Sequence, residues 1–368
     1  MKFTISRDAL MKPLNMVAGV VERRQTLPIL SNVKIELDEG VLSLTGTDLE
    51  VELVGRIELS DSSDTGEVTV PARKLADICK SLPDGSDVEF SVEAERVVVK
   101  SGRSRFTLST LPANDFPTIE QAVGSTQFTV NQSQLKRLIE RTAFSMAQQD
   151  VRYYLNGMLF EVSSSQLRSV ATDGHRLAMA TMVDQFDGIN EAQQVILPRK
   201  GVLELQRLLQ DPESDISIVI GSNHFRASTA EFTFTSKLVD GKFPDYERVL
   251  PRGATTPMLS QRTELRDSLS RTAILSNEKY RGVRLIVDND NLDIHANNPE
   301  QEEAEETVGV EYNGDRIEIG FNVSYLIDVL GVLQGSQVRF QLTDGASSVL
   351  IEDPEDEAAV YVVMPMRL

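Results

Sequence analysis

The sequence has no tryptophan, and Cys79 is the single cysteine among its 368 residues. A lone cysteine excludes an internal disulfide and fits a reducing compartment, so we expect a cytoplasmic protein. No apolar run approaches the ~20 residues that a membrane-spanning helix needs. Residues 1–5 show no secretion signal. Without tryptophan, the cores must be filled mainly by Leu, Val, Ile, Met and Phe.

Positive charge is also scarce, with 37 Lys and Arg against 56 Asp and Glu and a net charge of −19. This balance argues against nucleic acid, since most DNA-binding domains are basic. The deficit is uneven, because residues 121–244 carry 12 basic and 13 acidic side chains whereas residues 245–368 carry 11 and 23. An acidic average can hide a basic stripe, so the position of the bases matters more than their sum.

Histidine occurs three times, at His175, His224 and His295. No Cys or Ser lies in a recognisable nucleophile motif, and no pair of ligands has metal spacing. Segment 172–177, Thr-Asp-Gly-His-Arg-Leu, has three interpretations: a surface turn made by Asp-Gly, the wall of a binding site, or a catalytic histidine. We expect no cofactor and no bound metal.

The chain repeats one unit three times at a spacing of 125 residues. The copies of its first strand begin at Asn32, Gly157 and Gly282, and apolar residues alternate with period 2 in register. Such alternation predicts half-buried strands joined as hairpins. The matching apolar positions are Val33, Met158 and Val283; Ile35, Phe160 and Leu285; Leu37, Val162 and Val287; and Leu42, Leu167 and Leu292.

Two helices are predicted in each unit by apolar residues at helical spacing. One precedes the hairpin, over residues 7–17, 132–143 and 263–273, with Ser6, Asn131 and Thr263 as N-caps. The other follows it, over residues 72–82, 199–209 and 323–333.

Helices and strands segregate within each unit, which favours an α+β fold with an antiparallel sheet on one side and two helices on the other. We place the boundaries near residues 120 and 250, giving domains 1–120, 121–250 and 251–368. The simplest interpretation of the repeats is a rigid structural array.

Basic residues recur on the predicted helices of all three units, while acids concentrate in strands and loops. These bases form either solvated faces or one surface that admits a phosphate backbone. They are Lys12, Arg73, Lys74, Lys80, Lys136, Arg137, Arg141, Arg199, Lys200, Arg207, Arg266 and Arg271.

Segment 148–154, Gln-Gln-Asp-Val-Arg-Tyr-Tyr, joins a helix to a hairpin in the second unit. Arginine beside tyrosines suits phosphate contact and base stacking. The alternative is a linker whose tyrosines pack against the next unit.

Segment 300–306, Glu-Gln-Glu-Glu-Ala-Glu-Glu, has three interpretations. It lacks the spacing of a calcium loop but could hold a divalent cation. It also fits a charged edge strand that discourages aggregation. As an interface it would face a basic partner, which the first unit offers at Lys74, Arg96, Arg103 and Arg105. A heterologous contact of this kind closes into a ring if the rotation permits.

The C-terminal segment 362–368, Val-Val-Met-Pro-Met-Arg-Leu, is apolar almost to its end, whereas a solvated tail would be polar. We expect it to pack, and its methionines suit an adaptable binding surface.

These segments, with others, carry a resemblance along essentially the whole chain. The sequence resembles the bacterial DNA polymerase III beta subunit, the sliding-clamp family. The matching motifs also include Thr26-Leu-Pro-Ile-Leu30, Gly46-Thr-Asp-Leu-Glu50, Pro198-Arg-Lys-Gly201, Ser236-Lys-Leu-Val-Asp-Gly241 and Phe243-Pro-Asp-Tyr246.

The resemblance implies the DNA clamp fold, in which two chains join head to tail into a ring of six domains with inner helices and outer sheets. Duplex DNA threads the ring independently of its sequence. The implied function is that of a non-catalytic processivity factor. The implied partners are a clamp loader, the replicative polymerase alpha subunit, translesion polymerases, mismatch-repair proteins and ligase, most of them docking through short peptides. The implied location of the protein is the cytoplasm, where it associates with the nucleoid at replication forks.

The resemblance also implies three sets of site residues. Those implied to contact DNA are Arg24, Arg73, Gln149, Arg152, Tyr153, Tyr154, Arg199 and Lys200. Those implied to form a peptide-binding pocket are Leu155, Thr172, Gly174, His175, Arg176, Leu177, Pro244, Arg248, Val249, Tyr325, Ser348, Val362, Met364, Pro365 and Met366. Those implied to form the dimer interface are Lys74, Ile78, Arg103, Arg105, Phe106, Leu108, Ile274, Leu275, Glu300, Glu303 and Glu305.

Two other functions stay open from the residues alone. One is a metal-dependent DNA-processing enzyme that uses the acids of segment 300–306. The other is a catalytically silent interaction module with no role on DNA.

Overall fold

The computed structural model describes residues 1–21, 27–59, 64–119, 124–189, 191–251 and 255–367. Within these ranges the chain forms two compact units. Unit 1 holds Met1–Ser133, Asp187–Ile189 and Lys200–Leu238, and unit 2 holds Gln134–Phe186, Asn190–Arg199 and Val239–Leu368. No helix among the described residues is long and apolar enough to cross a membrane.

All six predicted helices are present, and each bound lies within one residue of its expected place. They are α1 (Arg7–Ala18), α2 (Ala72–Ser81), α3 (Gln132–Thr142), α4 (Arg199–Leu208), α5 (Arg262–Thr272) and α6 (Val323–Val332).

Local hydrogen bonds show why two of these helices begin where they do. The Ser6 hydroxyl accepts from the amide of Ala9 at 3.2 Å, and the Asn131 side chain accepts from the amide of Ser133 at 2.9 Å. The predicted cap at Thr263 is wrong, because α5 begins one residue earlier and follows Gln261.

Unit 1 contains an eight-stranded antiparallel sheet in the order β5-β2-β3-β4-β16-β15-β14-β9 and a four-stranded sheet in the order β1-β6-β7-β8. The strands are β1 (Lys2–Ser6), β2 (Asn32–Asp38), β3 (Val41–Thr47), β4 (Val51–Glu58), β5 (Gly66–Pro71), β6 (Asp87–Glu93), β7 (Arg96–Ser101), β8 (Ser104–Ser109), β9 (Gly124–Asn131), β14 (Asp215–Gly221), β15 (His224–Ser228) and β16 (Phe232–Lys237).

Unit 2 contains a nine-stranded sheet in the order β13-β10-β11-β12-β25-β24-β23-β17-β21 and a four-stranded sheet in the order β20-β19-β18-β22. The strands are β10 (Gly157–Val162), β11 (Gln166–Thr172), β12 (Arg176–Val183), β13 (Gln193–Pro198), β17 (Thr256–Gln261), β18 (Gly282–Asp288), β19 (Asn291–Asn297), β20 (Glu303–Gly309), β21 (Glu311–Tyr312), β22 (Ile317–Asn322), β23 (Gln337–Leu342), β24 (Val349–Asp353) and β25 (Asp356–Val363).

Each long sheet joins strands of two successive sequence repeats. In unit 1, β4 pairs with β16, so that Leu53 lies opposite Phe234. In unit 2, β12 pairs with β25, so that Leu177 lies opposite Val362. The repeats are therefore joined by main-chain hydrogen bonds, and the boundaries near residues 120 and 250 stay predictions.

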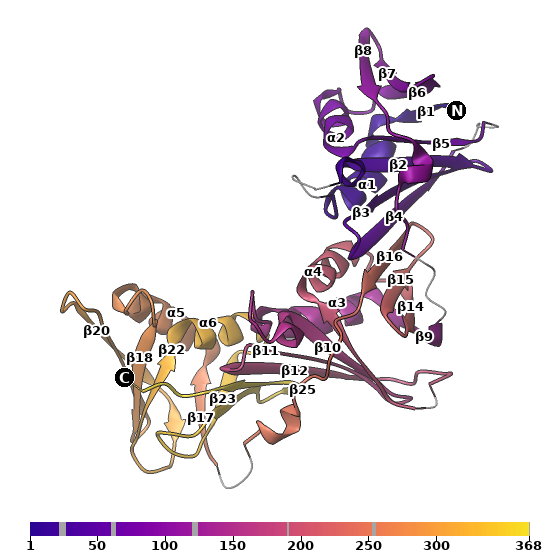
Figure 1. The fold of residues 1–368 in the computed structure, drawn as a ribbon. Helices are drawn as coiled ribbons and strands as arrows, with labels where there is room; N and C mark the ends of the chain where they lie inside the picture. Colours follow the sequence, from indigo (N-terminus) through magenta and orange to yellow (C-terminus); the bar gives the residue numbers. More distant parts are fainter. Residues whose placement is uncertain (22–26, 60–63, 120–123, 190, 252–254, 368) are drawn as a thin grey trace. The chain divides into compact units, whose positions relative to one another are not determined.

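Helices cover one face of the sheets, as the segregated pattern predicts (Figure 1). In unit 1, α1 packs on α2 and on β3 and β4, and it buries Leu10 and Leu14 completely or nearly so. In unit 2, α5 packs on α6 and on β19 and β20, and it buries Leu265 and Leu269. The cores lie between these helices and the sheets.

The acidic segment enters β20, which stands at the edge of its four-stranded sheet. This confirms the edge-strand interpretation of residues 303–306. Across the described ranges, no cluster of three or more His, Cys, Asp and Glu could hold a metal ion. The sheet of unit 1 that contains β8 ends in the same way, with β8 at its edge.

Gly157 lies opposite Pro198, where β10 pairs with its antiparallel neighbour β13. A Cβ atom there would stand 2.6 Å from the carbonyl oxygen of Leu197 and 2.9 Å from a methyl group of Ile196. We expect Gly157→Ala to lower the free energy of unfolding by roughly 1–3 kcal/mol, because the backbone contact cannot relax freely. Chemical denaturation followed by circular dichroism measures the shift.

Gly309→Ala is the matched control, because a Cβ at this strand glycine meets nothing within 4 Å. Equal stability of Gly157→Ala and Gly309→Ala would contradict the packing account.

Candidate functional site

The turn between β11 and β12 is held by its own side chains. The Thr172 hydroxyl donates to the carbonyl of Arg176 at 2.6 Å and accepts from the amide of Gly174 at 3.1 Å. Asp173 Oδ1 accepts from the amides of His175 and Arg176 at 2.9 and 3.0 Å. Gly174 has φ of +89°, which glycine adopts at little cost. The turn interpretation of segment 172–177 is confirmed.

Arg176 is held by three partners and is almost buried. Its guanidinium donates to Asp173 Oδ2 at 3.0 Å, to Asp328 Oδ2 at 2.6 Å and to the carbonyl of Phe144 at 2.7 Å. The guanidinium carbon lies 4.5 Å from the ring centroid of Tyr325. These contacts use three of its five N–H donors and hold Arg176 beside the turn.

The C-terminal segment is packed against this turn, as expected from its apolar sequence. The amide of Met364 donates to the carbonyl of His175 at 2.9 Å, and the amide of Met366 donates to the carbonyl of Gly320 at 2.8 Å. Met364 keeps 44% of its surface exposed. An apolar side chain is thus held at the surface by main-chain bonds.

A buried apolar cluster lies beneath the turn and the C-terminal segment. It contains Leu177, Val362, Phe243 and Tyr246, so segment 243–246 is brought to the strands β12 and β25. Leu155 is also buried. Around this floor the side chains of Pro244, Val249 and Met364 are exposed, and Tyr325, Ser348, Pro365 and Met366 are partly exposed.

Unit 2 therefore contains every residue predicted for the peptide pocket. Contacts gather most of them around the turn. Arg248 belongs to the same short helix η5 (Tyr246–Arg248) as the buried Tyr246, but its side chain is 82% exposed and pairs with Asp245 at 2.7 Å. A floor of apolar side chains with a few polar groups at its edge is the usual composition of a peptide site.

The loop of residues 148–154 is fixed by Asp150. Its carboxylate accepts from the Arg152 amide at 2.8 Å and from two guanidinium nitrogens at 3.0 and 2.9 Å. These contacts, above all the hydrogen bond from the Arg152 side chain, lower the pKa of Asp150 to about 2. Arg152 also donates to the carbonyl of Asp173 at 3.3 Å, which ties the loop to the turn.

The two tyrosines of this loop differ in exposure. Tyr153 is 57% exposed, whereas Tyr154 is partly buried and packs against the cluster of Leu177 and Val362. Their ring centroids lie 6.0 Å apart at 68°. Tyr153 is free to meet a ligand, while Tyr154 fits the packing interpretation. Gln149, beside them, has φ of +57°.

The other residues predicted to contact DNA are divided between the units. In unit 1, Arg73 is exposed on α2, and Lys200 Nζ lies 2.5 Å from Asp48 Oδ2. In unit 2, burial and then the charge of Arg176 lower the pKa of Arg199. Arg24 lies outside the described residues.

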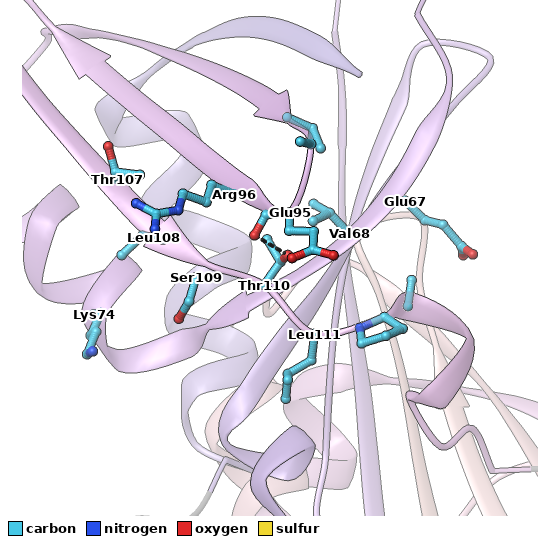
Figure 2. A pocket seen from close by; sticks show the side chains of 14 residues that line it. Glu67, Val68, Lys74, Glu95, Arg96, Thr107, Leu108, Ser109, Thr110 and Leu111 are labelled. Atoms are coloured by element: carbon cyan, nitrogen blue, oxygen red, sulfur yellow. Dashed lines mark hydrogen bonds between the residues drawn. The ribbon is translucent and has the colours of Figure 1, made fainter.

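The predicted interface residues of unit 1 surround β8 and α2. Lys74 and Leu108 line a cavity of about 860 Å³ beside β8, together with Arg96 (Figure 2). Figure 2 also shows the Thr110 hydroxyl donating to the carbonyl of Glu95, at 2.8 Å. Of the remaining members, Arg103 and Arg105 are exposed, and Ile78 and Phe106 are partly exposed.

The predicted interface residues of unit 2 lie at and beside the edge strand β20. Glu303 and Glu305 are exposed on β20, and Glu300 is exposed just before it. Ile274 is 75% exposed, which is unusual for a large apolar side chain, and Leu275 beside it is partly exposed. The edge strand β8 of unit 1 thus has exposed basic side chains at it, and the edge strand β20 of unit 2 has exposed acidic ones.

Three family models match the chain in order. They describe the N-terminal, central and C-terminal domains of the DNA polymerase III beta subunit, and they match residues 1–120, 129–245 and 247–367. The chain belongs to the DNA polymerase III beta subunit family. Its function is therefore that of a sliding clamp, a non-catalytic processivity factor of DNA replication.

Sliding clamps of other bacteria are similar to this chain over their full length. The beta sliding clamp of Pseudomonas aeruginosa is 64% identical and that of Escherichia coli K12 is 54% identical, each with 100% of both chains covered. A crystal structure of the Pseudomonas aeruginosa clamp bound to griselimycin has a TM-score of 0.97 at 64% identity, with both chains fully covered. The Caulobacter crescentus clamp, with polyethylene glycol bound to a putative beta-motif tethering region, has a TM-score of 0.94 at 40% identity and full coverage of both chains.

Sequence reasoning missed the residues that hold two of the predicted site residues in place. Asp150 fixes Arg152, while Phe144 and Asp328 fix Arg176. Asp150 stands inside the quoted loop, so its spacing of two from Arg152 was available as a signal. Asp328 lies 152 residues from Arg176, and no local pattern connects them.

The contact between Asp150 and Arg152 should depend on pH, because it requires the ionised carboxylate of Asp150. Because the folded pKa lies below the ordinary value, the contact stabilises the loop above about pH 4 and is lost as the pH falls through about 2. Carboxyl ¹³C NMR should place the Asp150 midpoint near 2, and Arg152→Ala should move it up towards the ordinary value. Arg248→Ala removes an exposed arginine elsewhere and should leave it unchanged. A midpoint near 4 in the unaltered chain would contradict the contact.

Proposed function

We propose that two copies of this chain close head to tail into a ring around duplex DNA, and that the ring holds a replicative polymerase through the pocket beside the turn at Gly174. The observation that carries the proposal is the pairing of successive repeats through edge strands.

The pairing rule is the same at both junctions inside the chain. The strand after the turn of one repeat pairs with the last strand of the next repeat, as β4 does with β16 and β12 with β25. By the same rule, β20, the strand after the turn of the third repeat, would pair with the last strand of a following repeat. β8, the last strand of the first repeat, would pair with the strand after the turn of a preceding repeat. Among the strands that the structure describes, β20 pairs only with β19 and β8 only with β7, so each has one unpaired edge. Pairing of β20 with β8 of a second copy supplies both, and a two-fold repetition closes the assembly.

Charge and apolar contact support this edge pairing. Arg103 and Arg105 at β8 would face Glu303 and Glu305 at β20, and opposite charges across a strand pair stabilise it. The exposed Ile274 would be buried against the partner copy. The acids at this edge would then serve the interface and not a metal.

The proposed DNA contacts suit a ring that slides. Phosphate contacts carry no sequence information, and retention by topology makes tight binding unnecessary. Arg152 is already paired with Asp150, so a phosphate would share its guanidinium with that carboxylate. Arg73 and Tyr153 are exposed, and we assign them, with Gln149, Tyr154, Arg199, Lys200 and Arg24, to the path of the DNA.

The pocket residues support recognition of short linear peptides. The exposed side chains of Val249 and Met364 suit apolar peptide side chains, and Met364 can adapt its shape to different sequences. One such pocket in each copy would serve the replicative polymerase, translesion polymerases, repair proteins, ligase and the clamp loader in turn. A cytoplasmic location at replication forks stays a prediction.

Deletion of the C-terminal segment tests whether the peptide pocket and the dimer interface are independent of each other. Deletion of residues 364–368 should abolish binding of a fluorescent peptide that carries the polymerase's clamp-binding segment, because Met364 and Met366 form part of the pocket wall. Sedimentation should still show a dimer, since the main-chain bond of Met366 to the sheet that contains β20 is at β22, the edge opposite β20.

Ile274→Asp is the reciprocal variant. It should weaken the dimer, because it puts a charge into the proposed interface, and it should leave peptide affinity within about twofold. Loss of the dimer in the deletion, or of peptide binding in Ile274→Asp, would contradict the assignment.

A further inference from the structure

The first repeat contains a turn with the same hydrogen bonds as the turn beside the proposed peptide pocket. The Thr47 hydroxyl donates to the carbonyl of Val51 at 2.9 Å and accepts from the amide of Leu49 at 3.1 Å. Asp48 Oδ1 accepts from the amides of Glu50 and Val51 at 2.9 and 2.7 Å. These are the contacts of Thr172 and Asp173, displaced by 125 residues.

The strand beside this turn also corresponds to its counterpart in unit 2. The amide of Lys237 donates to the carbonyl of Glu50 at 2.9 Å, as the amide of Met364 does to that of His175. Lys237 thus takes the place of Met364.

The same register extends to the neighbouring strand and to the segment after each repeat. Phe225 lies opposite Ser236, and Val349 lies opposite Val363, so His224 takes the place of Ser348. Pro117 takes the place of Pro244, since the Phe-Pro motifs that end the first two repeats lie 127 residues apart.

These residues of unit 1 line an open cavity of about 310 Å³. Its lining includes Thr47, Leu49, Pro117, His224 and Lys237, the counterparts of five residues assigned to the peptide pocket. Ile119 completes an apolar wall, and its amide donates to the buried carboxylate of Glu52 at 2.9 Å, which fixes segment 117–119. The volume lies at the small end of ligand pockets, with room for about one side chain and its backbone.

At two positions the residue of the first repeat differs in kind from its counterpart in the second, and these two differences indicate what the cavity would bind. Leu49 stands where the other turn has Gly174, and it has φ of +77°, a strained conformation for leucine, with 37% of its surface exposed. This adds an apolar wall at the rim. Lys237 adds a cation at the rim, and its ammonium lies 3.1 Å from Glu50 in a pair exposed on both sides. Exposed pairs stabilise little, so Lys237 can exchange Glu50 for a ligand carboxylate.

We propose that this cavity is a second docking site, which takes a short extended peptide segment with one aliphatic side chain in the cavity and an adjacent carboxylate on Lys237. The proposal rests on the proposed function, because peptide binding is inferred from the equivalent pocket. It adds a site of different preference, so that one chain has two non-equivalent peptide sites.

The test uses the full-length chain with ¹³C-labelled Ile, Leu and Val methyl groups and the probe peptide acetyl-Gly-Leu-Asp-Gly-amide. Saturable shifts of the Leu49 and Ile119 methyls are expected. The Leu-Asn analogue of the probe should bind at least about fivefold more weakly. Lys237→Met, which removes the charge and keeps the length, should cause a similar loss, whereas Lys242→Met at an exposed lysine should not.

The methyls of Leu177 and Val362 report the other pocket in the same sample. Shifts there without shifts at Leu49 and Ile119 would overturn this proposal and leave the proposed function standing. If the shifts at Leu49 and Ile119 give the same affinity with the Asn analogue and in Lys237→Met, the role of Lys237 is overturned, and with it the preference for an acidic peptide.

Discussion

Antiparallel pairing between the edge strand of one repeat and the last strand of the next is the interaction on which the rest of the structure depends. It turns three copies of one unit into two continuous sheets, with β4 hydrogen-bonded to β16 and β12 to β25. The pairing leaves β8 and β20 as edges of four-stranded sheets. Exposed edges are a hazard unless they are blocked or paired. A second copy that pairs both edges removes the hazard, and in doing so it produces the closed ring that a sliding clamp requires.

The turn before each of these pairing strands carries different side chains in the three repeats. In the second repeat it carries Gly174 and, with the packed C-terminal segment, forms the proposed peptide pocket. In the first it carries Leu49 and borders a cavity of about 310 Å³. In the third it is a longer loop, in which Asn298 accepts from the amide of Glu302 at 2.9 Å, and it leads into the acidic edge β20. One position in the repeat thus supports three different surfaces: side chains change around a common main-chain turn in the first two repeats, and the loop is longer in the third.

Much of this was predictable from local pattern. The 125-residue repeat, the six helices and the strands after them follow from apolar periodicity, and the packed C-terminus follows from its composition. The sheet order was not predictable, because the pairing of Leu53 with Phe234 joins residues far apart in the chain and leaves no local signal. The cap at Thr263 failed for a smaller reason, since α5 begins at Arg262 after an uncapped Gln261.

The site residues divide in the same way. A turn is predictable from the residue types and order of Thr172, Asp173 and Gly174. The contact of Arg152 with Asp150 is also predictable, because the two residues are only two positions apart. Arg176, by contrast, looked available to a ligand in the sequence, and long-range contacts to Asp328 and Phe144 make it a brace. Exposure separates Tyr153 from Tyr154, which the sequence presents as an equal pair.

The central claim is closure around DNA, and retention on circular against linear DNA tests it most directly. The chain is loaded onto a nicked circle with a clamp loader and ATP, freed from the loader by gel filtration, and followed after a restriction enzyme linearises the circle. The account predicts stable retention on the circle and rapid loss after cleavage, with the DNA otherwise unchanged. Equal retention on both forms would show binding by affinity instead of topology and would contradict the account.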